Sequence, residues 1–152
     1  MSAENLKRFA LLEELSDEER ELLDEHLEVE ELAEGRVLFE EGVEAEGLFL
    51  VLEGEVALET REQGRLARLG PGAALGGLSL ISARRREVTA LTVTACSVAH
   101  MERASFRRLV DDAPRLGCRL LEALLHETTA QLREALPALR QALPSAPNDG
   151  HG

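Results

Sequence analysis

The sequence predicts an α+β fold: short N-terminal helices, an antiparallel β-barrel or jelly roll (a double-stranded β-helix), and C-terminal helices. Three observations carry this prediction. Apolar residues recur at helical spacing near both ends of the chain. Between these segments, short apolar runs alternate with glycines, which is typical of closely spaced strands and turns. The length of 152 residues suits one domain with a core of its own.

Residues 1–28 are expected to form two short helices. The segment ENLKRFALLEEL carries apolar residues at helical spacing, namely Leu6, Phe9, Leu12 and Leu15. Ser16 followed by Glu19 is a capping box, which predicts that a second helix begins in DEERELLDEHL.

Residues 29–101 are expected to form the barrel. The segments VLFEEG, GLFLVLEG, EVALET and RLARLGPG each predict a strand that is closed by a turn residue. Two of these adjoin in GLFLVLEGEVALET, where Glu53 and Gly54 form the bend. This pair predicts a β-hairpin.

Residues 102–136 return to a helical pattern. ERASFRRLVDD predicts a short amphipathic helix, and Pro114 is well placed as the first residue of a longer one. Pro137 is expected to kink or end that helix. Residues 137–152 are then a tail, and SAPNDGHG is expected to be disordered.

The longer helix carries a heptad-like apolar stripe. Its members are Leu121, Leu125, Thr128, Leu132 and Ala135. The stripe is too short to establish a coiled coil. It is compatible with packing on the barrel and equally with packing against a second copy of the chain.

The charge distribution bears on partners. The formal net charge is -12, and residues 1–34 hold thirteen acidic against three basic side chains. This acidity repels nucleic acid and anionic membrane surfaces, so neither is an expected partner. No apolar run reaches the roughly 18 residues of a membrane span, and the N-terminus lacks a signal-peptide core. A cytoplasmic location is therefore expected.

Other chemistry finds little support in the residues. Cys96 and Cys118 lack metal-ligand spacing and lie in apolar contexts, which predicts buried small side chains. The four histidines are scattered without metal-like spacing, and His100 is expected at the edge of the core. Ser79 and Ser82 have no recognisable base or orienting acid. The prediction is a protein that is not an enzyme and holds neither metal nor cofactor.

The order of these features resembles the cyclic nucleotide-binding domain of catabolite-activator-type regulators and protein kinase A regulatory subunits. GRVLFEEG, LEGEV, ARLGPG and ALGGLSLI carry the resemblance, followed by an arginine and a threonine. It covers about residues 5–135. It implies a phosphate-binding cassette, here residues 75–89, in which the backbone N–H groups of a small helix and an arginine hold a cyclic phosphate.

The resemblance also assigns roles within the cassette. Gly76 matches the motif glycine, Leu78 and Ser79 match the residues that offer N–H groups, and Thr89 matches the final threonine.

The phosphate arginine has two candidates. Arg86 lies ten residues after Gly76, a separation common in the family, and Arg85 competes with it. Arg84 completes the run and is expected to face solvent or to form surface ion pairs.

Two residues depart from the family pattern. Gly77 stands where the family has a glutamate that accepts from the ribose 2′-hydroxyl, and Glu87 stands where a small residue is preferred. A hydrogen bond to a charged group contributes about 1.5–3 kcal/mol, so we expect Gly77→Glu to tighten cyclic nucleotide binding.

These features leave two functions open. The first is a stand-alone regulatory module that senses cyclic AMP, cyclic GMP or a related phosphate. It would signal through its C-terminal helices to a protein partner or a weak homodimer, because the chain stops where the family's transcription factors continue into a DNA-binding domain. The alternative is a degenerate domain that serves as a protein-interaction scaffold without binding nucleotide.

Overall fold

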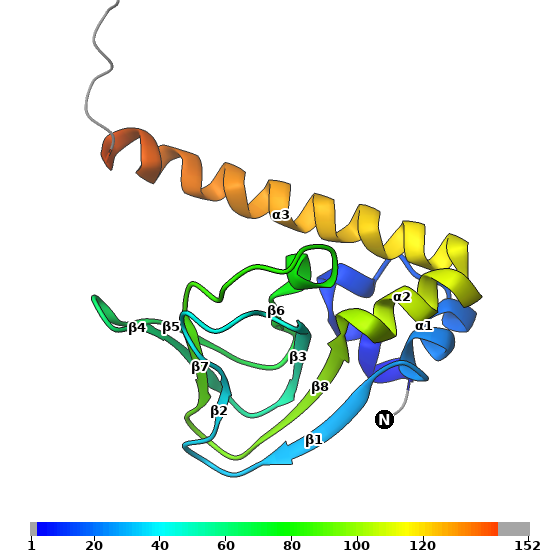
Figure 1. Ribbon diagram of the computed structural model, residues 1–152, viewed down its shortest axis with the longest axis horizontal. Helices are drawn as coiled ribbons and strands as arrows, with labels where there is room; N and C mark the ends of the chain where they lie inside the picture. The colour runs from blue at the N-terminus through cyan, green and yellow to red at the C-terminus, as the bar shows by residue number, and fades with distance from the viewer. Residues whose placement is uncertain (1–2, 143–152) are drawn as a thin grey trace, which may run out of the picture.

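The computed structural model describes residues 3–142, in which short helices precede eight strands and two further helices follow them (Figure 1). The first helices are the 3-10 helices η1 (Ala3–Arg8) and η2 (Ala10–Leu12) and the α-helix α1 (Asp17–Asp24). The strands are β1 (Glu28–Leu32), β2 (Val37–Phe39), β3 (Gly47–Glu53), β4 (Val56–Thr60), β5 (Gly64–Leu69), β6 (Ala74–Leu75), β7 (Thr89–Thr92) and β8 (Cys96–Glu102). A 3-10 helix, η3 (Gly77–Leu80), separates β6 from β7. The predicted α+β jelly roll with flanking helices is confirmed.

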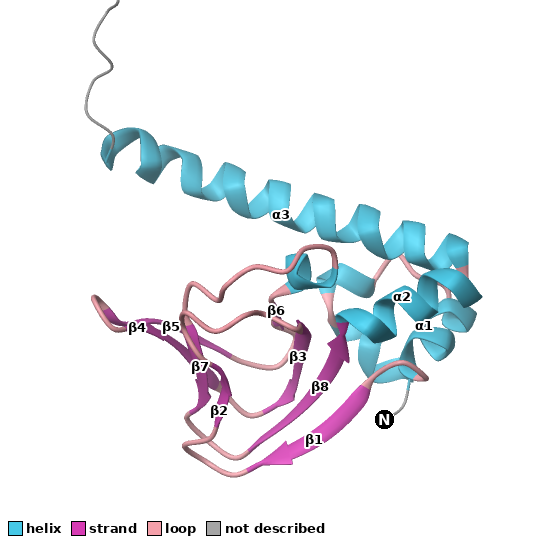
Figure 2. Ribbon diagram, in the orientation of Figure 1, coloured by secondary structure: helices cyan, strands magenta, loops and turns pink. Residues whose placement is uncertain are grey.

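The strands form two antiparallel four-stranded sheets. The N-terminal helices lie at one end of the sheets, and the long C-terminal helix extends from that end along one side of them (Figure 2). One sheet has the order β1-β8-β3-β6 and the other β2-β7-β4-β5. β3 is buried on both faces because Leu48 and Leu50 pack against the helices while Phe49 and Val51 pack between the sheets. This double burial explains its unbroken apolar run.

The predicted hairpin of β3 and β4 is wrong. The two strands belong to different sheets, and β4 pairs instead with β5 and β7. Gly54, with φ 85°, turns the chain from one sheet to the other. A side chain there would overlap the carbonyl oxygen of Ala95, so this crossing needs glycine for space as well as for its conformation.

The N-terminal segment is helical, but its first part is 3-10 helix. The four apolar residues of the segment recur strictly every third residue, and all are buried: Leu6, Phe9, Leu12 and Leu15. A period of three matches the three residues per turn of a 3-10 helix and keeps these side chains in one row. The predicted capping box is confirmed, since Ser16 and Glu19 each accept from the other's backbone N–H.

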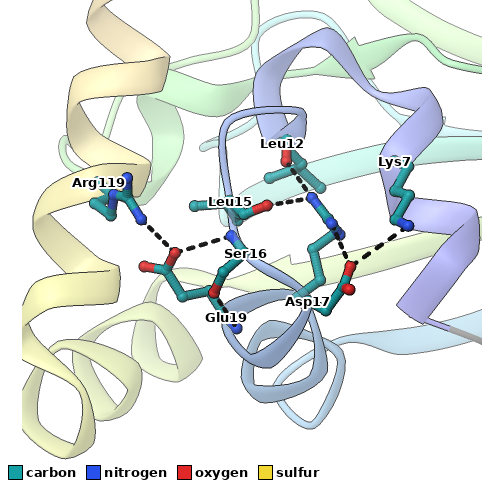
Figure 3. Close-up of polar contacts among 8 residues, drawn as sticks. Lys7, Leu12, Leu15, Ser16, Asp17, Glu19 and Arg119 are labelled. Carbon is teal, nitrogen blue, oxygen red and sulfur yellow. Dashed lines mark hydrogen bonds and ion pairs between the residues drawn. The ribbon is translucent and has the colours of Figure 1, made fainter.

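Polar contacts tie these short helices together (Figure 3). Arg20 is buried, and its guanidinium donates to the Leu15 carbonyl and to Oδ1 of Asp17 at 2.6 Å. Arg20 and then Lys7 hold the pKa of Asp17 below its usual range. Nη1 of Arg119 donates a hydrogen bond to Oε1 of Glu19 at 2.5 Å, which joins the C-terminal part of the chain to α1.

The C-terminal helices are α2 (Arg103–Asp112) and α3 (Pro114–Ala142). Pro114 begins α3 as predicted. The prediction that Pro137 could end the helix is wrong, because α3 continues through it to Ala142. An interior proline removes one helical hydrogen bond and crowds the preceding turn, but it does not end this helix. The expected disordered segment SAPNDGHG lies outside the described residues.

The expected burial of the two cysteines is correct for one of them and wrong for the other. Cys96 is buried as expected, but Cys118 on α3 is exposed. Leu125 and Leu132 are also exposed, whereas Leu121 packs against the core.

Within residues 3–142, none of the helices combines the length and apolar character needed to cross a membrane.

Candidate functional site

A cavity of about 470 Å³ lies where the cassette, the barrel and α3 meet. The cassette residues that line it are Leu75, Gly76, Gly77, Leu78, Ser79 and residues 84–88. The lining from α3 consists of Leu124, Glu127 and Thr128. In Figure 1, α3 passes directly over η3, so the long helix covers the cassette.

The chain enters the cassette through a left-handed glycine. Gly76 has φ 75° and precedes η3, whose first turn closes with the Ser79 N–H donating to the Gly76 carbonyl at 3.0 Å. A Cβ at Gly76 would overlap Nη1 of Arg86. Glycine is therefore required here both for its conformation and for the approach of the arginine.

Arg86 is buried beside this glycine and is only 8% exposed. Its Nη2 donates to the Gly47 carbonyl at 2.7 Å, and its guanidinium carbon lies 4.0 Å from the centre of the Phe39 ring. Its Nε is buried and has no hydrogen-bond partner in the described part of the chain. Burial, and then the charge of Arg103, lower the pKa of Arg86, while Glu46 acts in the opposite direction.

Arg85, the competing candidate, has a different environment. Its side chain is exposed, and Nη1 donates to the Gly42 carbonyl at 3.1 Å, although the residue also lines the cavity. Thr89 begins β7, and its hydroxyl accepts from the Glu41 N–H at 2.9 Å. The structure therefore brings Gly76, Gly77, Leu78, Ser79, Arg85 and Arg86 to one cavity, while Thr89 supports the neighbouring loop.

Both departures from the family pattern lie at this cavity. Glu87 contributes to its lining. Gly77 lies under α3, and a Cβ there would overlap Cδ2 of Leu124. The absence of a side chain at Gly77 is thus what allows α3 to lie this close to the cassette.

Arg103 links the cassette to α2. Its Nε donates to the Ser79 carbonyl at 2.9 Å and its Nη2 to the Ala45 carbonyl at 2.5 Å. Both acceptor residues line the cavity. A movement of the cassette would therefore change the hydrogen bonds of Arg103, which is the first residue of α2.

Sequence reasoning does not identify several residues of this site. Phe39 belongs to the quoted GRVLFEEG motif, but nothing in that motif indicates an arginine above its ring. Thr128 stands out only as part of the apolar stripe, and Glu127 carries no signal at all. Their placement depends on where α3 crosses the barrel, which local sequence patterns do not encode.

Comparisons with known proteins agree with this geometry. The family described as "Cyclic nucleotide-binding domain" matches residues 29–113. The chain is 30% identical over 105 residues to a cAMP-dependent protein kinase regulatory subunit of Eremothecium gossypii, covering 69% of this chain and 23% of that protein. It is 26% identical over 106 residues to a CRP-like cAMP-activated global transcriptional regulator of Mycobacterium tuberculosis, covering 67% of this chain and 47% of the regulator.

Solved structures show the same fold. A cyclic nucleotide-binding domain from Methylobacillus flagellatus KT superposes with a TM-score of 0.79 at 26% identity, covering 96% of this chain and 85% of that one. The chain spans less than half the length of the two curated relatives described above. The matched residues include most of the barrel, the whole cassette and α2. The chain therefore belongs to the cyclic nucleotide-binding domain family.

Proposed function

We propose that the chain is a regulatory module that binds a cyclic nucleotide, cyclic AMP or cyclic GMP, in the cavity between the cassette and α3. One observation carries the proposal: Arg86 is a buried cation whose Nε lacks a partner among the described residues. Within residues 3–142 no carboxylate lies at ion-pair distance from Arg86. Glu46 acts on Arg86 only from beyond ion-pair distance. A buried cation without a direct ion pair is costly, and an anionic ligand would supply one.

The output of the module follows from the walls of the cavity. Leu124, Glu127 and Thr128 belong to α3, so a bound ligand would change the contacts that hold this helix on the cassette. Leu125 and Leu132 on the same helix have exposed side chains, which are available to contact another chain. We infer that the signal passes through α3 to a protein partner or to a second copy in a weak homodimer.

Titration calorimetry tests the ligand. Cyclic AMP and cyclic GMP are each compared with the corresponding nucleoside, which lacks the phosphate. We expect heat of binding only with the cyclic nucleotides. Arg86→Ala should abolish it, and Arg86→Lys should weaken it, because lysine keeps the charge but loses the guanidinium geometry.

Arg85→Ala is the matched control, since Arg85 lines the same cavity from an exposed position. It should reduce affinity less than Arg86→Ala does, with circular dichroism showing that each variant is folded. Loss of binding in Arg85→Ala alone would identify Arg85 as the phosphate arginine. No binding by the wild-type chain would instead favour the scaffold function, for which Glu87 in the cavity lining is the supporting observation.

A further inference from the structure

We propose that Glu127 of α3 is the carboxylate acceptor that the cassette lacks at Gly77, and that it accepts a hydrogen bond from a neutral O–H or N–H donor of the ligand. The inference rests on the proposed function, because it names a residue that would select among cyclic nucleotides. It also defines the ligand class more narrowly: an anion that carries a separate hydrogen-bond donor.

Glu127 belongs to the stretch of α3 that lies over Gly77. Leu124 lies over Gly77 closely enough that a Cβ there would overlap its side chain. Glu127 follows Leu124 by three residues, which places it on the same face of α3 one turn along. Both residues line the same cavity as Gly77. The helix that occupies the space above the glycine therefore also brings a carboxylate into the site.

The Glu127 carboxylate has no ion-pair or hydrogen-bond partner among the described residues. Glu127 is half-buried. Burial raises its pKa. A desolvated carboxylate without a donor has unused acceptor capacity, because each of its oxygens can accept more than one hydrogen bond.

The charge of Glu127 determines which part of a ligand it can bind. The cyclic phosphate is an anion, so it is drawn to Arg86 and repelled by a carboxylate. An ionised carboxylate only accepts hydrogen bonds, so it recognises donors such as a ribose hydroxyl or an exocyclic amine. A ligand that is only a phosphate would gain nothing from Glu127.

Binding of three ligands tests the proposal. These are cyclic AMP, its 2′-deoxy analogue, and the analogue that lacks the 6-amino group. In the wild-type chain, loss of the donor that Glu127 binds should reduce affinity by roughly tenfold to 150-fold, as for a hydrogen bond to a charged group. Glu127→Met, which has a similar volume and no acceptor, should bind cyclic AMP more weakly and lose this discrimination. Glu127→Gln should retain part of it.

Glu134→Gln is the matched control, because Glu134 is exposed farther along α3 and does not line the cavity. Loss of discrimination against the 2′-deoxy analogue identifies the hydroxyl as the donor, and loss against the other analogue identifies the amine. Unchanged relative affinities in Glu127→Met, with intact binding of cyclic AMP, would overturn the role of Glu127 and leave the proposed function standing. No binding by the wild-type chain would overturn both.

Discussion

At the scale of single residues, two buried nitrogen atoms lack hydrogen-bond partners among the described residues: Nε of Arg86 and Nε2 of His100. They lie at the two ends of a series of planar groups. The Arg86 guanidinium covers Phe39, Phe39 and Phe49 have centroids 5.8 Å apart, and Phe49 stacks on His100 at 4.2 Å. Arg86 can gain a partner from a ligand, whereas His100 avoids a second buried charge by staying neutral.

His100 should make stability depend on pH. Burial lowers its pKa below the ordinary 6.5, and Arg86 lowers it further against the opposing charges of Glu102, Glu28 and Glu30. A depressed histidine pKa means that the unfolded chain binds the proton more tightly. The stability contributed by neutral His100 is therefore present above pH 6.5 and is lost as the pH falls through the folded-state pKa.

Urea unfolding between about pH 8 and pH 5 measures this effect. His100→Phe is the reference variant, because phenylalanine keeps the stacking on Phe49 and does not titrate. As the pH falls, the unfolding free energy of the wild type should decrease more than that of the variant. NMR titration of the His100 ring gives an independent value. A midpoint at or above 6.5 would contradict the prediction.

At the scale of elements, the contact of α3 with η3 decides how the cassette is covered. Gly77 and Leu124 occupy adjoining space, and Leu124 is only 3% exposed. The sequence alone predicts that Gly77→Glu tightens nucleotide binding. The structure changes this expectation, because any side chain at position 77 must first displace Leu124.

A double-mutant cycle tests this contact. Gly77→Ala should destabilise the fold by about 1–3 kcal/mol, as inserting an extra carbon into packed space does. Leu124→Ala should cost about 2–5 kcal/mol through the cavity that it leaves. The double variant should be more stable than the sum of the two effects predicts, because truncation of Leu124 makes room for the methyl group added at position 77. Thermal and urea unfolding measure all four proteins, and strict additivity would show that the residues do not compete for space.

At the scale of the whole molecule, α3 packs against the core with some of its leucines and exposes others to solvent. Its N-terminal half packs on the core through Leu116, Leu120 and Leu124, all almost fully buried. Leu125 and Leu132 on the same helix are 59% and 54% exposed. The apolar stripe expected from the sequence is therefore divided: Leu121 joins the core, Thr128 lines the cavity, and two leucines remain for a partner.

We expect these leucines to support a weak homodimer, since two copies related by a two-fold axis would bring the same face of α3 together. A seam of about two heptads is marginal by itself, so association should depend strongly on concentration. Sedimentation velocity across a concentration series measures it. Leu125→Glu and Leu132→Glu should give monomer, whereas Ile81→Glu, at a comparably exposed position outside α3, should not change the association. A wild-type monomer at high concentration would direct the search to a different partner protein.

The sequence by itself determined the order of N-terminal helices, strands and C-terminal helices, and it located four of the eight strands, β2 to β5. Helical period, glycine spacing and the Ser16 capping box are local properties, which is why the sequence can show them. It also identified the cassette and both candidate arginines. Tertiary structure alone decided that β3 and β4 lie in different sheets, that Arg86 is buried while Arg85 is exposed, and that Leu124 and Glu127 join the cavity. Each of these outcomes depends on contacts between segments far apart in the chain, and a local pattern carries no information about which distant surface it will meet.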